Sequence, residues 1–85
     1  MIGNQMRRMM IVMANNPYPM TIMDILEKDG AINELASYRY MIILNEKQYV
    51  SCVAMATHGS KIPKRFYSLT EKGKQYVKEL SVVAV

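Results

Sequence analysis

Methionines dominate the hydrophobic pattern at the start of the chain. They recur every three or four residues, at Met6, Met9, Met10 and Met13. This spacing places side chains on one face of an α-helix, whereas Arg7 and Arg8 fall off that face. The pattern therefore predicts a helix over residues 4–14. Pro17 and Pro19 follow the helix and end it, because proline cannot continue a helix and biases the residue before it away from helical geometry.

A second, shorter apolar segment begins with a capping residue. The hydroxyl of Thr21 can accept a hydrogen bond from a free backbone N–H of the first turn. Asp24 lies in that turn, where a carboxylate suits the positive end of the helix dipole. The apolar residues of the helix are Ile22, Ile25 and Leu26. We expect the helix to stop at Asp29 and Gly30, where glycine can adopt the left-handed conformation that ends many helices.

Residues 32–45 predict a third helix. We expect its inward side to carry Leu35, Ala36, Tyr40, Met41 and Leu44. The outward side would then carry Asn33, Ser37, Tyr38 and Arg39. Ile42 and Ile43 widen the apolar arc, so the pattern leaves the buried face open. Because only a short turn containing Gly30 separates this helix from the one before it, the two form a candidate helix-turn-helix.

The pattern changes from helical to strand-like after residue 48. Residues 49–56 (YVSCVAMA) and 65–69 (RFYSL) hold β-branched and aromatic residues and predict two short strands. The intervening segment, THGSKIPK, contains the glycine and proline typical of turns. We therefore expect a β-hairpin with a fairly long, basic tip. Tyr67 and Leu69 share one strand face and should point inward.

A last helix follows the second strand directly. Thr70 can cap it, and its lysines should face solvent or a partner. The residues that would pack it onto the core are Tyr76, Val77 and Leu80. Gly73 lowers helix stability, which predicts close packing at that position. The expected order is helix, helix, helix, strand, strand, helix: a mainly α fold with a small β-hairpin (α+β), in which residues 1–85 form a single domain.

The net charge of +4 is distributed unevenly along the chain. Residues 20–46 carry two cations against five carboxylates, a net charge of −3. Residues 57–78 carry six cations against one carboxylate, a net charge of +5, and Arg7 and Arg8 add positive charge near the start. A lysine-rich segment is often only a solvated surface, but clustering by sign favours an anionic partner.

The sequence offers little for catalysis or metal binding. Cys52 and His58 are the only residues of their types, so neither an intrachain disulfide nor a zinc site of Cys and His ligands can form. There is no phosphate-binding glycine loop and no credible nucleophile with its base. We expect no enzymatic activity, no metal and no cofactor. A single cysteine fits a reducing compartment such as the cytoplasm, and no apolar run approaches the ~18 residues that cross a bilayer.

The junction between the second strand and the last helix resembles a known signature. It reads FYSLTEKG over residues 66–73, similar to the Y-x-L-T-x-x-G sequence that ends the wing in many bacterial and archaeal winged-helix regulators. Leu44, followed by residues 48–50 (QYV), is similar to the end of their recognition helix and the entry to their wing. That family usually has glycine where this chain has Gln48. The resemblance covers roughly residues 5–80.

This resemblance implies a winged helix-turn-helix and sequence-specific binding of double-stranded DNA by a small transcription regulator. In that family the third helix enters the major groove and the wing contacts the backbone or the minor groove. Base contacts would come from Asn33, Ser37, Tyr38 and Arg39. Wing contacts would come from His58, Lys61, Lys64 and Arg65. Arginine suits guanine, asparagine suits adenine, and wing cations suit phosphates. The resemblance also implies a homodimer through the terminal helices.

Three of these assignments have a plainer alternative. Arg39 can form an ion pair with Glu34 or Glu46, Tyr38 can be a core or surface residue, and His58 can be only a loop residue. The helix-turn-helix segment is net negative, which repels phosphate. The alternative function is a winged-helix protein–protein interaction module without DNA binding. Its contact surfaces would be the methionine-rich first helix and the apolar tail SVVAV, residues 81–85.

Overall fold

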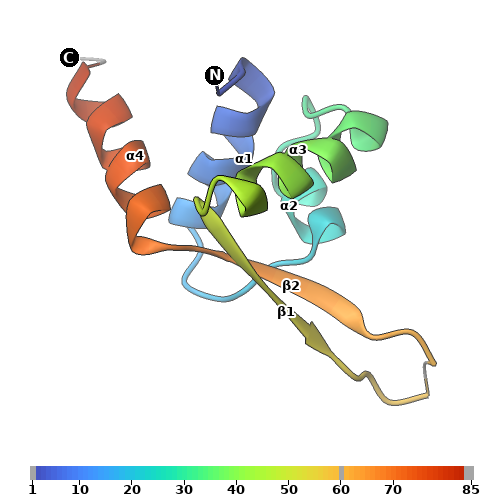
Figure 1. Cartoon of the computed structure of the whole chain (residues 1–85). Helices are drawn as coiled ribbons and strands as arrows, with labels where there is room; N and C mark the ends of the chain where they lie inside the picture. The colour runs from blue at the N-terminus through green and yellow to red at the C-terminus, as the bar shows by residue number, and fades with distance from the viewer. Residues whose placement is uncertain (1, 60, 84–85) are drawn as a thin grey trace.

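The computed structural model describes residues 2–59 and 61–83, of which 81–83 are described by their backbone alone, so the apolar tail proposed as a contact surface lies outside the described side chains. The helices and strands are α1 (Asn4–Ala14), α2 (Ile22–Lys28), α3 (Glu34–Glu46), β1 (Val50–Met55), β2 (Lys64–Leu69) and α4 (Glu71–Val83). This order confirms the predicted fold class. Figure 1 shows the hairpin projecting from a cluster of helices, with α4 standing beside α1.

The methionine face of α1 forms the centre of the core. Met9 and Met10 are 0% exposed, and Met6 and Met13 are also buried. α1 packs against α2, α3, α4 and β2, so its side chains must fill irregular gaps between four elements. Unbranched, flexible methionine suits that task. The predicted bounds and inward face of this helix are confirmed.

α2 begins as the sequence predicts but ends differently. Thr21 Oγ1 accepts a hydrogen bond from the Asp24 backbone N–H at 3.1 Å, and the Asp24 carboxylate accepts one from the Thr21 N–H at 3.0 Å. This reciprocal pair is a capping box. The expected left-handed conformation at Gly30 is wrong, because its φ is not positive. The chain instead leaves the helix through extended backbone at Asp29, whose carboxylate accepts hydrogen bonds from Arg8 and from the Ala31 N–H.

The orientation of α3 differs from the expected one at two positions. Leu35 is 86% exposed rather than inward, and Ser37 is 0% exposed rather than outward. The buried residues of the helix are Ser37, Met41 and Leu44, which lie four and then three positions apart on one face. Serine can occupy a buried position because its hydroxyl donates to the Glu34 carbonyl, 2.5 Å away. The apolar arc of α3 is wide, so the pattern could not decide between the two orientations.

β2 is hydrogen-bonded along both edges, to β1 on one side and to the segment before α2 on the other. β1 and β2 pair antiparallel, from Val50 opposite Leu69 to Met55 opposite Lys64. On the other edge of β2, Met20 and Tyr67 exchange two backbone hydrogen bonds of 2.9 and 2.8 Å. Tyr67 is buried, as predicted, and this burial raises the pKa of its hydroxyl. The segment before α2 therefore holds the base of the wing in place.

The junction before α4 is held by several specific contacts. Thr70 caps α4: its hydroxyl accepts from the Gly73 N–H at 3.1 Å and donates to the Gln48 carbonyl at 2.5 Å. Gln48 itself has a φ of 65°, a left-handed conformation that glycine adopts more readily. Gly73 is buried, and a Cβ added there would overlap the carbonyl oxygen of Tyr49. The predicted close packing at Gly73 is confirmed.

Replacing Gly73 should therefore destabilise the whole domain. We expect Gly73→Ala to lower the free energy of unfolding by about 1–3 kcal/mol or more, the usual cost of forcing atoms into a packed site. Gly30→Ala is the matched control, because a Cβ at Gly30 meets no atom within 4 Å. That variant should be neutral or slightly stabilising. Urea unfolding of both variants tests this, and equal midpoints for the two would contradict close packing at Gly73.

Candidate nucleic-acid interface

The outward face of α3 is mostly apolar. Leu35, Tyr38 and Ile42 are 86%, 48% and 59% exposed. At 100° per residue these three positions lie within about 60° of one another around the helix axis. Arg39 lies on the same face and is exposed. Of the exposed residues on this face only Arg39 carries a positive charge, and Glu46 carries a negative one.

The four α3 residues predicted to contact DNA do not share one environment. Asn33 is exposed at the N-cap, where its side-chain oxygen accepts from the Ala36 N–H at 2.9 Å. Ser37 is buried and points away from any ligand of the outward face. Tyr38 and Arg39 are exposed. Within the described part of the chain, Arg39 forms no ion pair with Glu34 or Glu46, so its guanidinium is available to a partner.

Leu35 and Ile42 are the outward residues that sequence reasoning does not identify. The hydrophobic pattern assigns Leu35 to the core and Ile42 only to an ambiguous arc. The signal that could have found them is the alternative stripe formed by Ser37, Met41 and Leu44. Its residues have the spacing of a buried helix face, four and then three positions apart. The stripe begins with a polar residue, however, so the hydrophobic pattern does not identify it as buried.

The wing carries the cations as expected. His58, Lys61, Lys64 and Arg65 are all exposed. Lys64 and Arg65 open β2, where they lie opposite Met55 and Ala54 of β1. All four residues belong to β2 or to the loop before it, and the hairpin extends away from the helices (Figure 1).

A hollow of about 560 Å³ joins α3 to the wing. Tyr38 and Ile42 border it from α3, and Lys64 and Arg65 border it from the start of β2. The N-terminal turn of α2 forms the remaining side. The apolar face of α3 and part of the basic wing therefore belong to one continuous surface, although about 20 residues separate them in the sequence.

The arginines of α1 are engaged within the protein. Arg8 donates two hydrogen bonds of 2.8 Å from Nε and an Nη atom to the two carboxylate oxygens of Asp29. This contact raises the pKa of Arg8 and lowers the pKa of Asp29. Arg7 donates to the hydroxyl of Tyr76 at 3.2 Å. Both arginines thus connect α1 to other elements, and the charge of Arg8 is largely neutralised.

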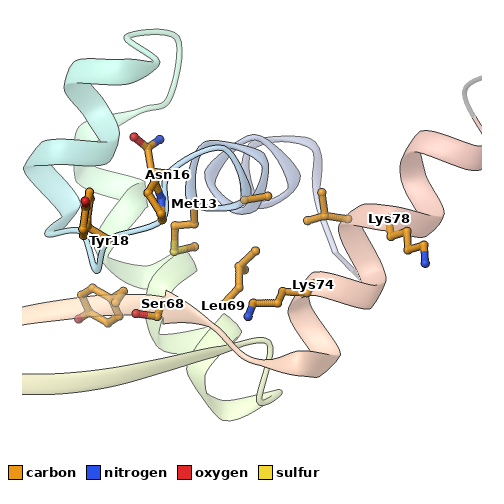
Figure 2. A pocket seen from close by; sticks show the side chains of 11 residues that line it. Met13, Asn16, Tyr18, Ser68, Leu69, Lys74 and Lys78 are labelled. Atoms are coloured by element: carbon orange, nitrogen blue, oxygen red, sulfur yellow. The ribbon is translucent and has the colours of Figure 1, made fainter.

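A second hollow, of about 570 Å³, lies between α1, β2 and α4 (Figure 2). Met13, Asn16 and Tyr18 line it from α1 and the loop after it, as Figure 2 shows. Leu69, Lys74 and Lys78 line it from β2 and α4. Its wall is mainly apolar, apart from the two lysines on α4, and it forms a groove between the terminal helices.

Other kinds of site find no support in the described residues. They contain no cluster of three or more His, Cys, Asp or Glu side chains that could hold a metal ion. None of the helices described here combines the length and apolar character needed to cross a membrane. The α3 face with the wing therefore stands as the main candidate interface.

Comparison with known proteins identifies the fold. No protein-family model matches the chain, and no curated protein sequence matches it. Solved structures do match: ZitR from Lactococcus lactis has a TM-score of 0.76 and 22% identity over 98% of this chain and 58% of that one. A PadR-like transcription factor from Bacteroides fragilis has a TM-score of 0.74 and 22% identity, covering 92% of this chain and 79% of that one. Bacillus subtilis PadR in complex with operator DNA has a TM-score of 0.71 and 20% identity, covering 88% and 46%.

These similarities establish a winged-helix fold, shared with ZitR, the PadR-like transcription factor and PadR. The chain spans 58% of the ZitR chain and 46% of the PadR chain. In the order of its elements, α2 and α3 form the helix-turn-helix and the β1–β2 hairpin forms the wing.

The contact between Arg8 and Asp29 predicts a specific pH dependence. Because the folded-state pKa of Asp29 is lowered, its contribution to stability is fully present above the unfolded value of about 3.9. It is lost as the pH falls through the lower folded-state pKa. We expect Asp29→Asn to reduce the urea midpoint at pH 7 and to converge with the parent at acidic pH.

Urea midpoints measured between pH 7 and the acid transition test this. Glu27→Gln is the matched control, since Glu27 is exposed and forms no ion pair in the described part of the chain. A gap between parent and Asp29→Asn that stays constant at every pH would show that the carboxylate charge is not what stabilises the contact.

Proposed function

We propose that this chain is a DNA-binding transcription regulator that places α3 in the major groove and the wing on the backbone or in the minor groove. The observation that carries this proposal is the continuous surface shared by α3 and the basic end of β2. The winged-helix fold supports the proposal, because one solved structure with this fold, that of Bacillus subtilis PadR, is in complex with operator DNA. No catalytic role is part of the proposal, and the expected compartment is the cytoplasm.

The proposed base contacts follow the geometry of α3. The major groove, about 12 Å wide, admits an α-helix. Arg39 and Tyr38 lie on the exposed face, and Asn33 stands at its N-terminal end with its amide N–H₂ group still able to donate. Arginine can donate two hydrogen bonds to guanine. Ser37 is left out of the contact set because it is buried.

The proposed affinity comes mainly from the wing. Lys61, Lys64 and Arg65 are exposed cations on one arm, and each can neutralise a phosphate and release counterions. His58 lies exposed in the loop of the same hairpin and can add a hydrogen-bond donor. The acidic α2–α3 segment opposes binding, so the wing must supply the attraction that α3 lacks.

We further propose a homodimer formed through the terminal helices α1 and α4. The hollow between these helices offers an apolar groove that a second copy could fill. A two-fold pair would place its recognition helices about 34 Å apart, one turn of DNA. Sedimentation velocity of the full chain tests this, and a monomer at concentrations that saturate DNA would exclude it.

The second candidate function is a protein-interaction module. It is favoured by the net charge of −3 over residues 20–46 and by the apolar outward face of α3. Fluorescence anisotropy against a random-sequence duplex separates the two functions. Binding that weakens steeply with salt supports DNA recognition, and no binding even at low salt selects the protein-interaction module.

Removing the wing cations should weaken binding to every DNA sequence. We expect Lys61→Ala, Lys64→Ala and Arg65→Ala each to lower the slope of log K against log salt by about 0.9 for every phosphate that is no longer neutralised. Lys28→Ala is the matched control, because this exposed lysine lies at the far end of α2. The assignment of the wing fails if the control reduces the slope as much as the wing variants do.

Arg39→Ala should change selectivity instead. On the preferred site we expect binding to weaken by about 1–3 kcal/mol, the value of a good bidentate contact to guanine. Binding to random duplex should fall by much less. Anisotropy with both duplexes measures the ratio, and an equal reduction on both would make Arg39 a phosphate-binding residue only.

A further inference from the structure

The exposed face of α3 has a composition that hydrogen-bond readout does not explain. Its largest exposed side chains are Leu35, Tyr38 and Ile42, and Arg39 is its one cation. A single exposed leucine needs no explanation. Three large apolar side chains lie exposed on one face of one helix. Two of them, Tyr38 and Ile42, border a hollow that wing cations also border, which indicates a contact surface.

One edge of DNA matches such a surface. In the major groove the 5-methyl group of thymine is the apolar feature, whereas guanine, adenine and cytosine present hydrogen-bond donors and acceptors. An aliphatic side chain packed against those polar atoms would leave them without a partner, which is unfavourable. Packed against a methyl group, the same side chain removes apolar surface from water.

We propose that Leu35 and Ile42, flanked by the ring of Tyr38, read thymine 5-methyl groups, so that this chain selects sites by apolar contact more than by hydrogen bonds. The inference rests on the proposed DNA-binding function and names the kind of site that function would use. Arg39 adds one guanine contact within a thymine-rich element.

The positions of the side chains give the expected spacing. Leu35 and Ile42 are seven residues apart, about 10.5 Å along the axis at 1.5 Å per residue. That distance corresponds to about three base steps of 3.4 Å. Arg39 lies between them in the sequence. The preferred half-site should therefore hold two thymines about three steps apart, on either strand, with a guanine between them.

The surroundings favour DNA over a protein as the occupant. Lys64 and Arg65 border the same hollow as Tyr38 and Ile42, so the apolar strip is flanked by cations on the wing side. Asp24 borders the hollow from α2, where its carboxylate accepts a hydrogen bond from the Thr21 N–H. Arg39 lies on the strip itself and forms no ion pair in the described part of the chain. An anionic polymer with methyl groups in its groove satisfies both features at once.

The test uses the full chain and begins with selection of a preferred duplex from a random pool. Each thymine of that duplex is then replaced by uracil, which removes only the 5-methyl group, and the affinity is measured by anisotropy. We expect affinity to fall about three- to fourfold at each contacted thymine, the effect of one buried methyl group. Affinities for duplexes with cytosine or 5-methylcytosine at the same position give a second measure of the effect of the 5-methyl group.

Variants assign the effect to side chains. Leu35→Ala and Ile42→Ala should each abolish the difference in affinity between the thymine duplex and the uracil duplex at one contacted position. Each variant should retain that difference at the other position. Both positions are exposed on a helix and alanine favours helix, so the fold should tolerate the changes. Val53→Ala is the matched control, an exposed aliphatic residue on β1, and it should keep both differences.

The outcomes separate the two proposals. Salt-dependent binding that ignores the methyl group overturns methyl reading and leaves the DNA-binding function standing. A chain that binds no duplex at any salt concentration overturns both. A change in self-association caused by Leu35→Ala assigns the apolar strip to a second copy of the chain and overturns the proposal as well.

Discussion

The carbonyl oxygen of Tyr49 lies where three parts of the molecule meet, and the rest of the structure depends on this contact. The Tyr49 N–H donates to the carbonyl of Leu44 at the end of α3, at 2.9 Å, and its carbonyl accepts from the Thr70 N–H at 3.0 Å. The absence of a side chain at Gly73 is what allows α4 to approach it. The centroid of the Tyr49 ring lies 5.2 Å from that of the Tyr76 ring, and Lys72 Nζ lies 4.6 Å from the centroid of the Tyr49 ring. Backbone and side chain together fix α3, the wing and α4 to one residue.

This contact sets the direction of the wing relative to α3. β1 starts directly after Tyr49, so a change in the junction would alter the angle between the hairpin and α3. The pair of hydrogen bonds between Met20 and Tyr67 restrains the opposite edge. The hollow shared by α3 and the wing is thus bordered by elements that are held from both sides, as a preformed interface requires.

Charge and apolar surface are divided between the two arms of the candidate interface. The wing carries exposed cations, and the outward face of α3 carries large apolar side chains with one arginine. Arg8 does not add to the cationic surface, since Asp29 holds it in a bidentate contact. Attraction and selectivity would therefore reside in different elements. Under the proposed function, that division would offset the negative charge of the helix-turn-helix segment, because attraction between charges acts over several ångströms whereas apolar contacts act only at short range.

Local sequence patterns were enough to predict the order of the elements, the bounds and inward face of α1, the cap at Thr21 and the close packing at Gly73. These features depend on local spacing and on residues with one strong conformational preference. It also indicated the basic wing, because charge clusters survive folding as exposed residues. The buried face of α3 could not be predicted in this way, because the apolar arc was too wide to favour one side. Packing against the core buries Ser37 and leaves Leu35 exposed. The end of α2 was decided in the same way, by a contact between its terminal carboxylate and an arginine of α1 that no local pattern contains. Long-range contacts thus set which side chains of α3 face outward, and those side chains define the candidate interface.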